Sequence, residues 1–300
     1  MGHAQKMFLS TDFIKNVEEV LSKLIGSRFK IFNMLPVSGG DMHQSYQVQG
    51  SGESFFIKMN DAEALPNIFV LEREGLKLLE KVGGAVVPEL LVAGQFNSDA
   101  FLLMSWIEEG ENAAAAQASL GRMLASVHKK TNDFYGLEYD NYIGTLPQYN
   151  QPKASWADFF IEERLEKQLR HGESIGVIDT TLRLKFDRLF EAIPSLFPIE
   201  PPALLHGDLW KGNYMVSRKG IPFLIDPAVY YGHREMDLAL TQLFGGFDQA
   251  FYDAYEEVFP LEKDWKKRTD LWNLYILLFH ANVFGGSYLK QVSQMVDKFV

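Results

Sequence analysis

The spacing of apolar side chains divides the chain into a first part that alternates between helices and strands and a second part that is mainly helical. Apolar residues at helical spacing predict a helix over residues 10–27. A second helix is expected to begin near Pro66 and to end at Gly83. Five short apolar or alternating runs predict strands over residues 30–37, 44–50, 53–59, 89–96 and 99–107.

The pattern changes after Trp106, where helical spacing dominates. Helices are expected over residues 113–131, 154–172 and 180–193, and over much of the remaining C-terminal part. Two strand-like segments, 213–217 and 222–226, enclose a turn. We therefore expect an α+β fold of two lobes, a small sheet-rich lobe over residues 1–107 and a larger, mostly helical lobe over residues 108–300, with a ligand site between them.

The composition limits the classes of partner. A formal net charge of −10 argues against nucleic acid or an anionic membrane surface as the general partner. The absence of cysteine excludes disulfides, cysteine-based zinc sites and thiol nucleophiles, and it fits a cytoplasmic protein. No apolar run approaches the roughly 20 residues of a membrane-spanning helix, and no segment has the pattern of a signal peptide. Since no heptad repeat or apolar interface strip is visible, we expect a monomer.

Three polar residues in the second part carry the strongest chemical signal. Asp208 and Asn213 lie in the segment LLHGDLWKGNYMV, and Asp226 ends the strand-like run that follows. Asn213 and Asp226 supply the kind of oxygen ligand that Mg²⁺ on nucleotide phosphates prefers, and Asp208 supplies a carboxylate that can accept a hydroxyl proton. Each residue taken alone is more often a turn residue. Their order and spacing, however, are those of the catalytic and metal-binding elements of protein kinases.

A lysine inside an apolar strand, Lys58, gives independent support for this interpretation. A kinase-like enzyme needs a strand lysine that reaches nucleotide phosphates and pairs with a glutamate on the next helix. Because an unpaired buried lysine is costly, either Glu72 or Glu74 is expected to pair with it, and the apolar face of the helix favours Glu72. The alternative is an edge-strand lysine whose charged end reaches water.

Two weaker segments are candidates for nucleotide contacts. The first is a turn between strands whose backbone N–H groups can approach a phosphate, although such a turn is more often only a hairpin; it comprises Ser38, Gly39 and Gly40. The second is the strand end at the lobe boundary, which either presents backbone groups to adenine or simply leads into a loop; it comprises Met104, Ser105, Trp106 and Ile107.

With these residues identified, the chain resembles the fructosamine kinase (ketosamine-3-kinase) family, a branch of the aminoglycoside and choline phosphotransferase group with a protein-kinase-like fold. The segment LLHGDLWKGN resembles the signature H-G-D-L-W-x-G-N, and IDPAVYYGHREMDLA resembles the element D-P-x-x-x-Y-G-H-x-E-x-D-L-A. Asp140–Asn150, Trp156–Leu165 and Asn273–Tyr288 also resemble family segments.

The resemblance implies that ATP is the phosphoryl donor and that Mg²⁺ is a cofactor. It implies that Asp208 is the base, that Asn213 and Asp226 are the metal ligands, and that Lys58 with its glutamate holds the phosphates. It also implies that the acceptor is a ketoamine, either a small molecule or a glycated protein amine. Phosphorylation of its sugar would then free the amine, which is a deglycation repair activity.

Five further residues are expected around this core. Trp210 is either a wall for the acceptor or part of the core. Tyr231 and His233 are candidates for hydrogen bonds to sugar hydroxyls. Asp237 is expected to support the catalytic loop by accepting backbone N–H bonds, and His206 is expected to be a buried histidine that orients the same loop.

Two other functions stay open at this point. One is a phosphotransferase of the same fold with a different acceptor, such as an aminoglycoside, choline or a free sugar. The other is a nucleotide-binding protein without catalysis, although such a protein would not need Lys58, Asp208, Asn213 and Asp226 together. A metal-dependent hydrolase is disfavoured, because the sequence has no H-E-x-x-H and no cysteine.

Overall fold

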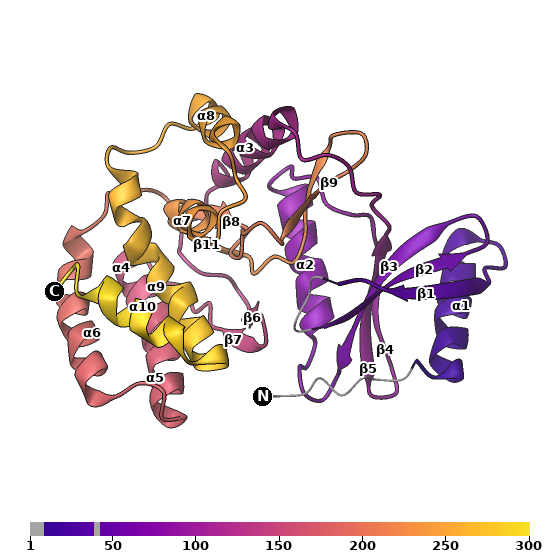
Figure 1. The fold of residues 1–300 in the computed structure, drawn as a ribbon, viewed down its shortest axis with the longest axis horizontal. Helices are drawn as coiled ribbons and strands as arrows, with labels where there is room; N and C mark the ends of the chain where they lie inside the picture. The colour runs from indigo at the N-terminus through magenta and orange to yellow at the C-terminus, as the bar shows by residue number, and fades with distance from the viewer. Residues whose placement is uncertain (1–8, 39–42) are drawn as a thin grey trace. The chain divides into compact units, whose positions relative to one another are not determined.

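The computed structural model describes residues 9–38 and 43–300, and the chain forms two compact units (Figure 1). One unit comprises Met1–Glu74 and Val87–Glu109, and the other comprises Gly75–Val86 and Gly110–Val300. Helix α2 (Ile68–Lys81) contributes residues to both units. A single boundary near residue 107 therefore does not describe the division, because residues 75–86 group with the second unit.

The first unit is built on an antiparallel sheet with the strand order β1-β2-β3-β5-β4. Its strands are β1 (Ile31–Pro36), β2 (Gln44–Gly50), β3 (Ser54–Asp61), β4 (Leu90–Phe96) and β5 (Asp99–Ser105). Strand β3 lies in the middle of this order, so Lys58 pairs with Ser45 on one side and with Leu102 on the other. The strands predicted from the apolar runs are confirmed, and only their ends differ.

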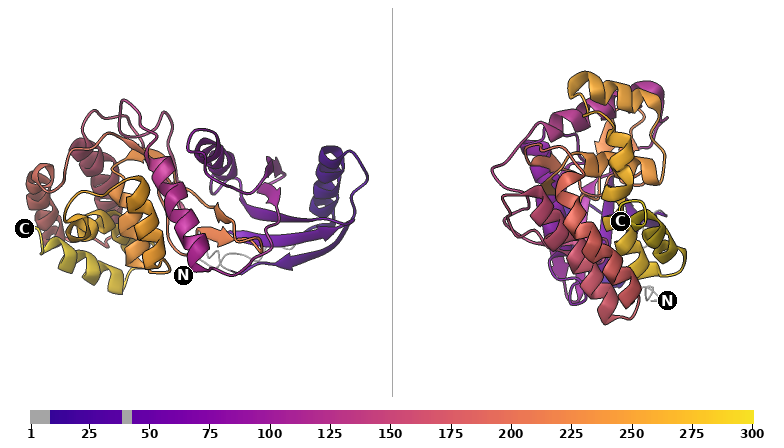
Figure 2. Two further views of the ribbon diagram at one scale, coloured as in Figure 1. Left: turned by 90° about the horizontal axis from the view of Figure 1, so that it is seen from above. Right: turned by 90° about the vertical axis from the view of Figure 1, so that its left-hand side faces the viewer.

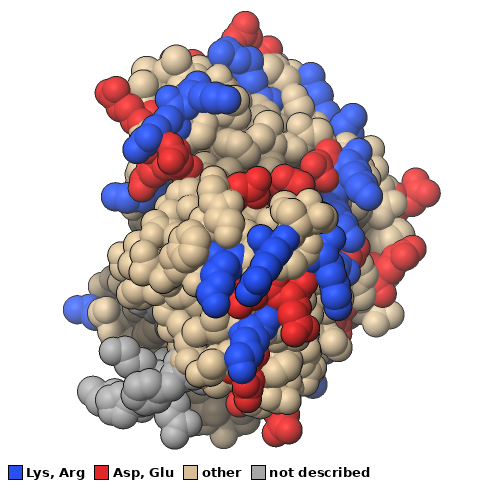
Figure 3. Space-filling view, turned by 90° about the vertical axis from the view of Figure 1, so that its right-hand side faces the viewer, with Lys and Arg blue, Asp and Glu red and all other residues tan. Residues whose placement is uncertain are grey.

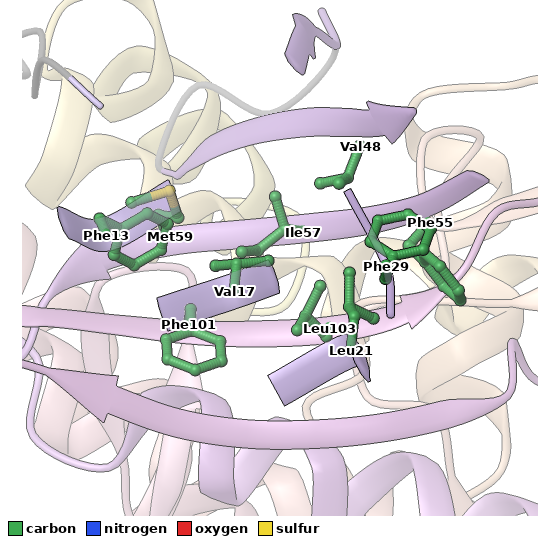
Figure 4. Close-up of a cluster of buried hydrophobic side chains, with 10 residues drawn as sticks. All are labelled: Phe13, Val17, Leu21, Phe29, Val48, Phe55, Ile57, Met59, Phe101 and Leu103. Atoms are coloured by element: carbon green, nitrogen blue, oxygen red, sulfur yellow. The ribbon is translucent and has the colours of Figure 1, made fainter. Parts of the chain in front are cut away.

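Helix α1 (Thr11–Ile25) buries one face against this sheet. The Ser10 side chain caps the helix by accepting a hydrogen bond from the Phe13 N–H at 3.0 Å. Phe13, Val17 and Leu21 recur every fourth residue and are fully buried, so they lie on one face. Figure 4 shows them against side chains from the sheet. Each such side chain contributes about 1.5–3 kcal/mol by leaving water.

The second unit is mainly helical (Figures 1 and 2). Its helices are α3 (Ala114–His128), α4 (Trp156–Phe159), α5 (Glu166–Ser174), α6 (Thr180–Ala192), α7 (Glu235–Leu243), α8 (Gln249–Val258), α9 (Trp265–Phe284) and α10 (Ser287–Val296). Helix α3 packs against α8, and α9 packs against both α7 and α10. Helix α9 is thus the central helix of this group.

Short antiparallel strand pairs fix the loops among these helices. They are β6 (Asn141–Ile143) with β7 (Leu146–Gln148), β8 (Ala203–Leu205) with β11 (Tyr230–Gly232), and β9 (Tyr214–Val216) with β10 (Pro222–Leu224). The sequence predicted the β9–β10 hairpin but not β6, β7 or β11. Strands of three residues are too short to show alternation. The turn between β9 and β10 marked that hairpin in the sequence, whereas β6, β7 and β11 are defined only by their partners in space.

The single helix predicted over residues 154–172 is instead α4, a π-helical turn over Phe160–Leu165, and α5. The wider turn contains Arg164, whose side chain is fully buried. A π-helical turn inserted between α-helical turns often occurs at functional sites. Here it places a long cationic side chain inside the second unit.

On the face drawn in Figure 3, Lys and Arg side chains are interspersed with Asp and Glu side chains. Among the described residues, neither sign covers this face continuously. In the described part of the chain no helix is both long and apolar enough to cross a membrane.

Candidate active site

The loop between β8 and β9 carries Asp208 and Asn213, and the structure brings their side chains together. The Asn213 amide Nδ2 lies 2.8 Å from the Asp208 carbonyl oxygen and 2.8 Å from Asp208 Oδ2. It also lies 3.3 Å from the carbonyl oxygen of Asp226. The amide N–H groups are used in these contacts, so the amide oxygen is the atom that Asn213 can offer to a cation.

Asp226 follows β10 and adopts a left-handed backbone conformation with φ +54°. The flanking residues bind this turn to the loop between β8 and β9. The Ile225 N–H donates to the Asn213 carbonyl at 3.1 Å, and the Ala228 N–H donates to the His206 carbonyl at 2.9 Å. The backbone around Asp226 is therefore hydrogen-bonded to the loop that carries Asp208. Non-glycine residues rarely adopt this conformation, and it occurs mainly where surrounding contacts enforce it.

Asp237 lies in the first turn of α7. Its side chain binds backbone N–H groups of the loop between β8 and β9. Its Oδ2 accepts the His206 N–H at 2.7 Å, and its Oδ1 accepts the Gly207 N–H at 2.9 Å. His128 Nε2 lies 3.1 Å from the same Oδ2. Burial by itself would raise the pKa of the Asp237 carboxyl, but the hydrogen bond and charge of His128, followed by His206 and the Gly207 N–H, lower it. A buried carboxylate thus holds the start of the loop in place.

Gly207 is required by the same arrangement. Its φ is +84°, and a Cβ atom there would lie 1.9 Å from the Ala228 carbonyl oxygen. Only glycine allows the loop to approach the Ala228 backbone this closely.

Burial raises the pKa of Asp208 well above its ordinary value, and the negative charges of Asp226 and Asp237 act in the same direction. The hydrogen bond from Asn213 acts against this shift. A carboxylate with a raised pKa is a better proton acceptor than an ordinary aspartate. The environment of Asp208 therefore suits a general base.

In the first unit, Lys58 Nζ lies 2.8 Å from Glu72 Oε1, and both side chains are nearly inaccessible to water. Glu74, the alternative partner, instead pairs with Arg73 at 3.0 Å. Lys58 also lies on β3, in the middle of the strand order. It is not the edge-strand lysine of the alternative interpretation.

His206 and His233 are both fully buried. His206 Nε2 lies 2.9 Å from the Ile225 carbonyl, so its ring helps to hold the turn before Asp226. His233 stacks on Trp272 with ring centroids 5.1 Å apart, and its Nε2 lies 3.2 Å from the Pro198 carbonyl. The hydrogen bond to sugar hydroxyls predicted for His233 does not fit this position, because the ring lies in an aromatic core.

Glu235 is a second buried polar residue of the segment around His233. Its carboxylate is fully buried and accepts hydrogen bonds from Trp272 Nε1 at 2.9 Å and from Arg268 Nε at 2.8 Å. Tyr231, which was also predicted to contact sugar, lies in β11 and is only 9% exposed. Most of the segment YYGHREMD is thus part of the interior of the second unit.

Trp210 is partly exposed and its indole has a defined orientation. A Cβ atom on Gly212 would lie 2.4 Å from the Trp210 ring, so the ring lies directly over the Gly212 backbone. On another side Phe244 contacts it edge-on, with centroids 6.2 Å apart. The indole is therefore available as a wall two residues from Asp208.

The candidates for nucleotide contacts in the first unit are only partly described. Ser38 is exposed, whereas Gly39 and Gly40 lie outside the described residues. Met104 is buried in β5, and Ser105 Oγ accepts the Glu89 N–H at 3.0 Å. Trp106 packs its ring near that of Phe56, and like Ile107 it is partly exposed.

A buried amide network beneath Ala228 was not predicted. Gln148 Nε2 donates to the Ala228 carbonyl at 3.0 Å and to Asn141 Oδ1 at 2.8 Å, and Asn141 Nδ2 donates to the Val229 carbonyl at 2.9 Å. Arg164 joins the network through Asn150 Oδ1 at 2.8 Å. The polar residues of the segment DNYIGTLPQYN were the available signal, but their partners are far away in sequence.

The donor set fits a magnesium ion held mainly by nucleotide phosphates. Such an ion takes only one or two protein oxygens, and Asn213 and Asp226 are the residues that would supply them. Within residues 9–38 and 43–300, no three His, Asp or Glu side chains form a cluster of the kind that would hold a metal by protein ligands alone.

Comparison with known proteins agrees with this geometry. The sequence matches the fructosamine kinase family over residues 13–300. An Enterococcus faecium protein named "Probable ketoamine kinase" is 40% identical over 274 residues, covering 89% of this chain and 95% of that protein. A Vibrio vulnificus protein of the same description is 35% identical, covering 95% of this chain and 98% of its own length.

Solved structures show the same relationship. A Thermobifida fusca protein, provisionally assigned as a fructosamine-3-kinase, superposes with a TM-score of 0.83 at 31% identity, covering 95% of this chain and 98% of that one. An aminoglycoside phosphotransferase, solved with AMP-PNP and hygromycin B, has a TM-score of 0.63 at 15% identity, covering 94% and 98%, and so shares the fold. The predicted α+β, protein-kinase-like fold is confirmed, and the chain belongs to the fructosamine kinase family.

Proposed function

We propose that this protein transfers the γ-phosphoryl group of ATP to a sugar hydroxyl of a ketoamine. The observation that carries the proposal is the contact of the Asn213 amide with both Asp208 and the backbone of Asp226. This contact joins the candidate base Asp208 to the two candidate metal ligands, Asn213 and Asp226, within one partly buried hydrogen-bonded unit. The family match and the ketoamine kinase names of its relatives support the choice of acceptor.

Asp208 is proposed to act as the general base. Its carboxylate accepts the proton of the attacking sugar hydroxyl, which is a weak nucleophile until that proton leaves. Asn213 holds Oδ2 and so directs the other carboxylate oxygen to the acceptor. Positioning of this kind is the main contribution a protein makes to phosphoryl transfer.

Lys58 is proposed to bind nucleotide phosphates, with Glu72 fixing the position of its ammonium group. Asn213 and Asp226 would hold Mg²⁺, which offsets the negative charge of the phosphates when it is bound. Asp237 and His206 are positioning residues for the loop, because their contacts reach it through the backbone and the Ile225 carbonyl.

The proposed biological consequence is deglycation. A ketoamine carries a secondary amine on its sugar, and the phosphorylated sugar would be a product whose decomposition frees the amine. The net negative charge of the chain favours approach of an acceptor that carries a protonated amine.

An acceptor screen tests the proposal. ATP consumption and product mass would be measured with a ribulosyl amine, a fructosyl amine, free ribose, choline and an aminoglycoside at equal concentrations. We expect turnover with the ketoamines, and Asp208→Asn should lower it by about 10²–10⁴-fold, the usual contribution of a general base. Asp253→Asn, which removes the same charge from an exposed carboxylate, is the matched control.

Two results would contradict the proposal. Equal or higher turnover with choline, the aminoglycoside or free ribose would move the chain to another acceptor class. Full activity of a folded Asp208→Asn protein would remove Asp208 from the role of base.

A further inference from the structure

An exposed run of aromatic rings continues from Trp210 over the surface of the second unit. We define the aromatic strip as Phe244, His280, Phe284 and Tyr288. Phe244 contacts Trp210 on one side and His280 on the other, with the Phe244 and His280 centroids 5.4 Å apart. His280 in turn lies 5.6 Å from Phe284 and 4.9 Å from Tyr288.

The strip is formed by the end of α7 and the corner between α9 and α10. His280 and Phe284 are four residues apart on α9 and so share a face. Gly285 and Gly286 both have positive φ, which reverses the chain and returns Tyr288 to the same rings. The corner thus assembles one continuous aromatic surface from two helices.

The four rings of the aromatic strip are only partly buried. Phe244 is 39% exposed and Phe284 is 52% exposed, while His280 and Tyr288 are partly exposed. Contiguous exposed aromatic side chains mark binding surfaces more often than isolated ones do. Because the strip continues directly from the indole beside Asp208, the molecule that covers it is expected to be the acceptor.

The strip is aromatic and contains no carboxylate, ammonium or guanidinium group. Burial lowers the pKa of His280, although the hydrogen bond to the Ile276 carbonyl acts in the opposite direction. The lowered pKa favours the neutral form of the ring, which does not repel a protonated amine. Aromatic faces of this kind attract both flat apolar groups and cations.

We propose that the aromatic strip binds the amine-bearing arm of the acceptor and favours ketoamines whose amine carries an aromatic group. The inference rests on the proposed function and adds the acceptor class. A ketoamine has two ends, and its sugar must lie at Asp208 for its hydroxyl to react. The arm on the amine nitrogen is then the part that extends past Trp210 onto the strip.

Two acceptors that share one sugar test this inference. They are the ribulosyl derivatives of benzylamine and of propylamine, which differ only in the arm. For the wild type we expect kcat/KM to be about tenfold higher for the benzyl compound, since one aromatic contact contributes about two- to tenfold. Phe284→Leu and Tyr288→Leu each keep an apolar side chain but remove the ring, and each should lower this ratio by about two- to tenfold.

Val283→Ala is the matched control, because Val283 is 37% exposed beside Phe284 and carries no ring. It should leave the ratio unchanged. An equal kcat/KM for the two compounds in the wild type, or an unchanged ratio in both leucine variants, would overturn the inference and leave the proposed function standing. If the wild type phosphorylates neither compound, both the inference and the proposed function are overturned.

Sedimentation of the wild type and the Phe284→Leu protein tests a different occupant. A dimer that this substitution dissociates would make the strip an interface between copies of the chain and would overturn the inference. Equal monomeric behaviour of the two proteins supports it.

Discussion

Asp237→Asn changes one atom of a buried side chain that makes three hydrogen bonds. In the wild type, Oδ1 accepts the Gly207 N–H, and Oδ2 accepts the His206 N–H and contacts His128. The amide group of asparagine cannot accept at both positions. One backbone N–H of the catalytic loop must then face another donor, because each of the two oxygens has a backbone N–H opposite it.

The expected cost follows from these contacts. A buried donor without an acceptor costs about 1–3 kcal/mol, and loss of the charge on the remaining acceptor costs about 1 kcal/mol more. We therefore expect Asp237→Asn to lower the free energy of unfolding by about 2–4 kcal/mol at pH 7. Activity should fall as well, because the loop that carries Asp208 loses a fixed attachment.

The pH dependence separates this explanation from a general packing defect. The folded protein holds the pKa of Asp237 below its ordinary value, which is that of the unfolded chain. Its stabilisation is fully present above the ordinary pKa of about 4 and is lost as the pH falls through the folded value. The stability gap between wild type and Asp237→Asn should therefore close as the pH is lowered below about 4.

Urea unfolding, followed by circular dichroism at a series of pH values, measures this gap. Asp253→Asn is the control, because it removes one exposed carboxylate and should unfold with the wild type at every pH. Equal stability of Asp237→Asn and wild type at pH 7 would refute the reasoning. A gap that stays constant down to pH 3 would refute the assignment to the Asp237 charge.

Two further substitutions have matched controls. Gly207→Ala places a Cβ atom 1.9 Å from the Ala228 carbonyl, whereas Gly220→Ala meets nothing within 4 Å at a similar positive φ. The positive φ should cost each variant about 1–2 kcal/mol of stability. Gly207→Ala should lose more than Gly220→Ala, because the Ala228 backbone must also shift, and only Gly207→Ala should lose most of its kcat. Equal stability or equal kcat of the two variants would contradict the close approach. Glu72→Gln breaks the buried pair with Lys58 and should raise the KM for ATP and cost up to about 3–5 kcal/mol, while Glu74→Gln should do neither. Nucleotide titration and thermal unfolding measure these effects, and equal behaviour of the two glutamine variants would contradict the assignment of Glu72.

The parts of the site that could be predicted from sequence are those set by short-range rules. Lys58 and Glu72 lie on a strand and on the helix after it, and the apolar face of that helix selected Glu72 over Glu74. Asp208 and Asn213 share one loop, whose spacing limits where their side chains can lie. In each case a polar or charged residue, which is costly to bury, lies in a segment whose apolar neighbours indicate burial.

The parts that could not be predicted depend on partners far away in sequence. His233 appeared to be a polar residue beside a catalytic element, but Trp272 from α9 stacks on it and makes it core. Gln148 and Asn141 gave no sign that they would bind the backbone at Ala228 and Val229, since neither pattern nor spacing encodes a contact across eighty residues. These contacts arise only when the helices pack.

The burial of His233 and Glu235 has a consequence for how relatives are recognised. The run YGHRE lies in the segment that resembles the family element, yet its polar side chains have their partners inside the second unit. Glu235 binds Trp272 and Arg268, and Arg234 binds Glu200. A sequence search that relies on this run selects proteins that share a scaffold. Differences in acceptor among such proteins have to be sought in other positions, where a substitution changes a surface without loosening the interior.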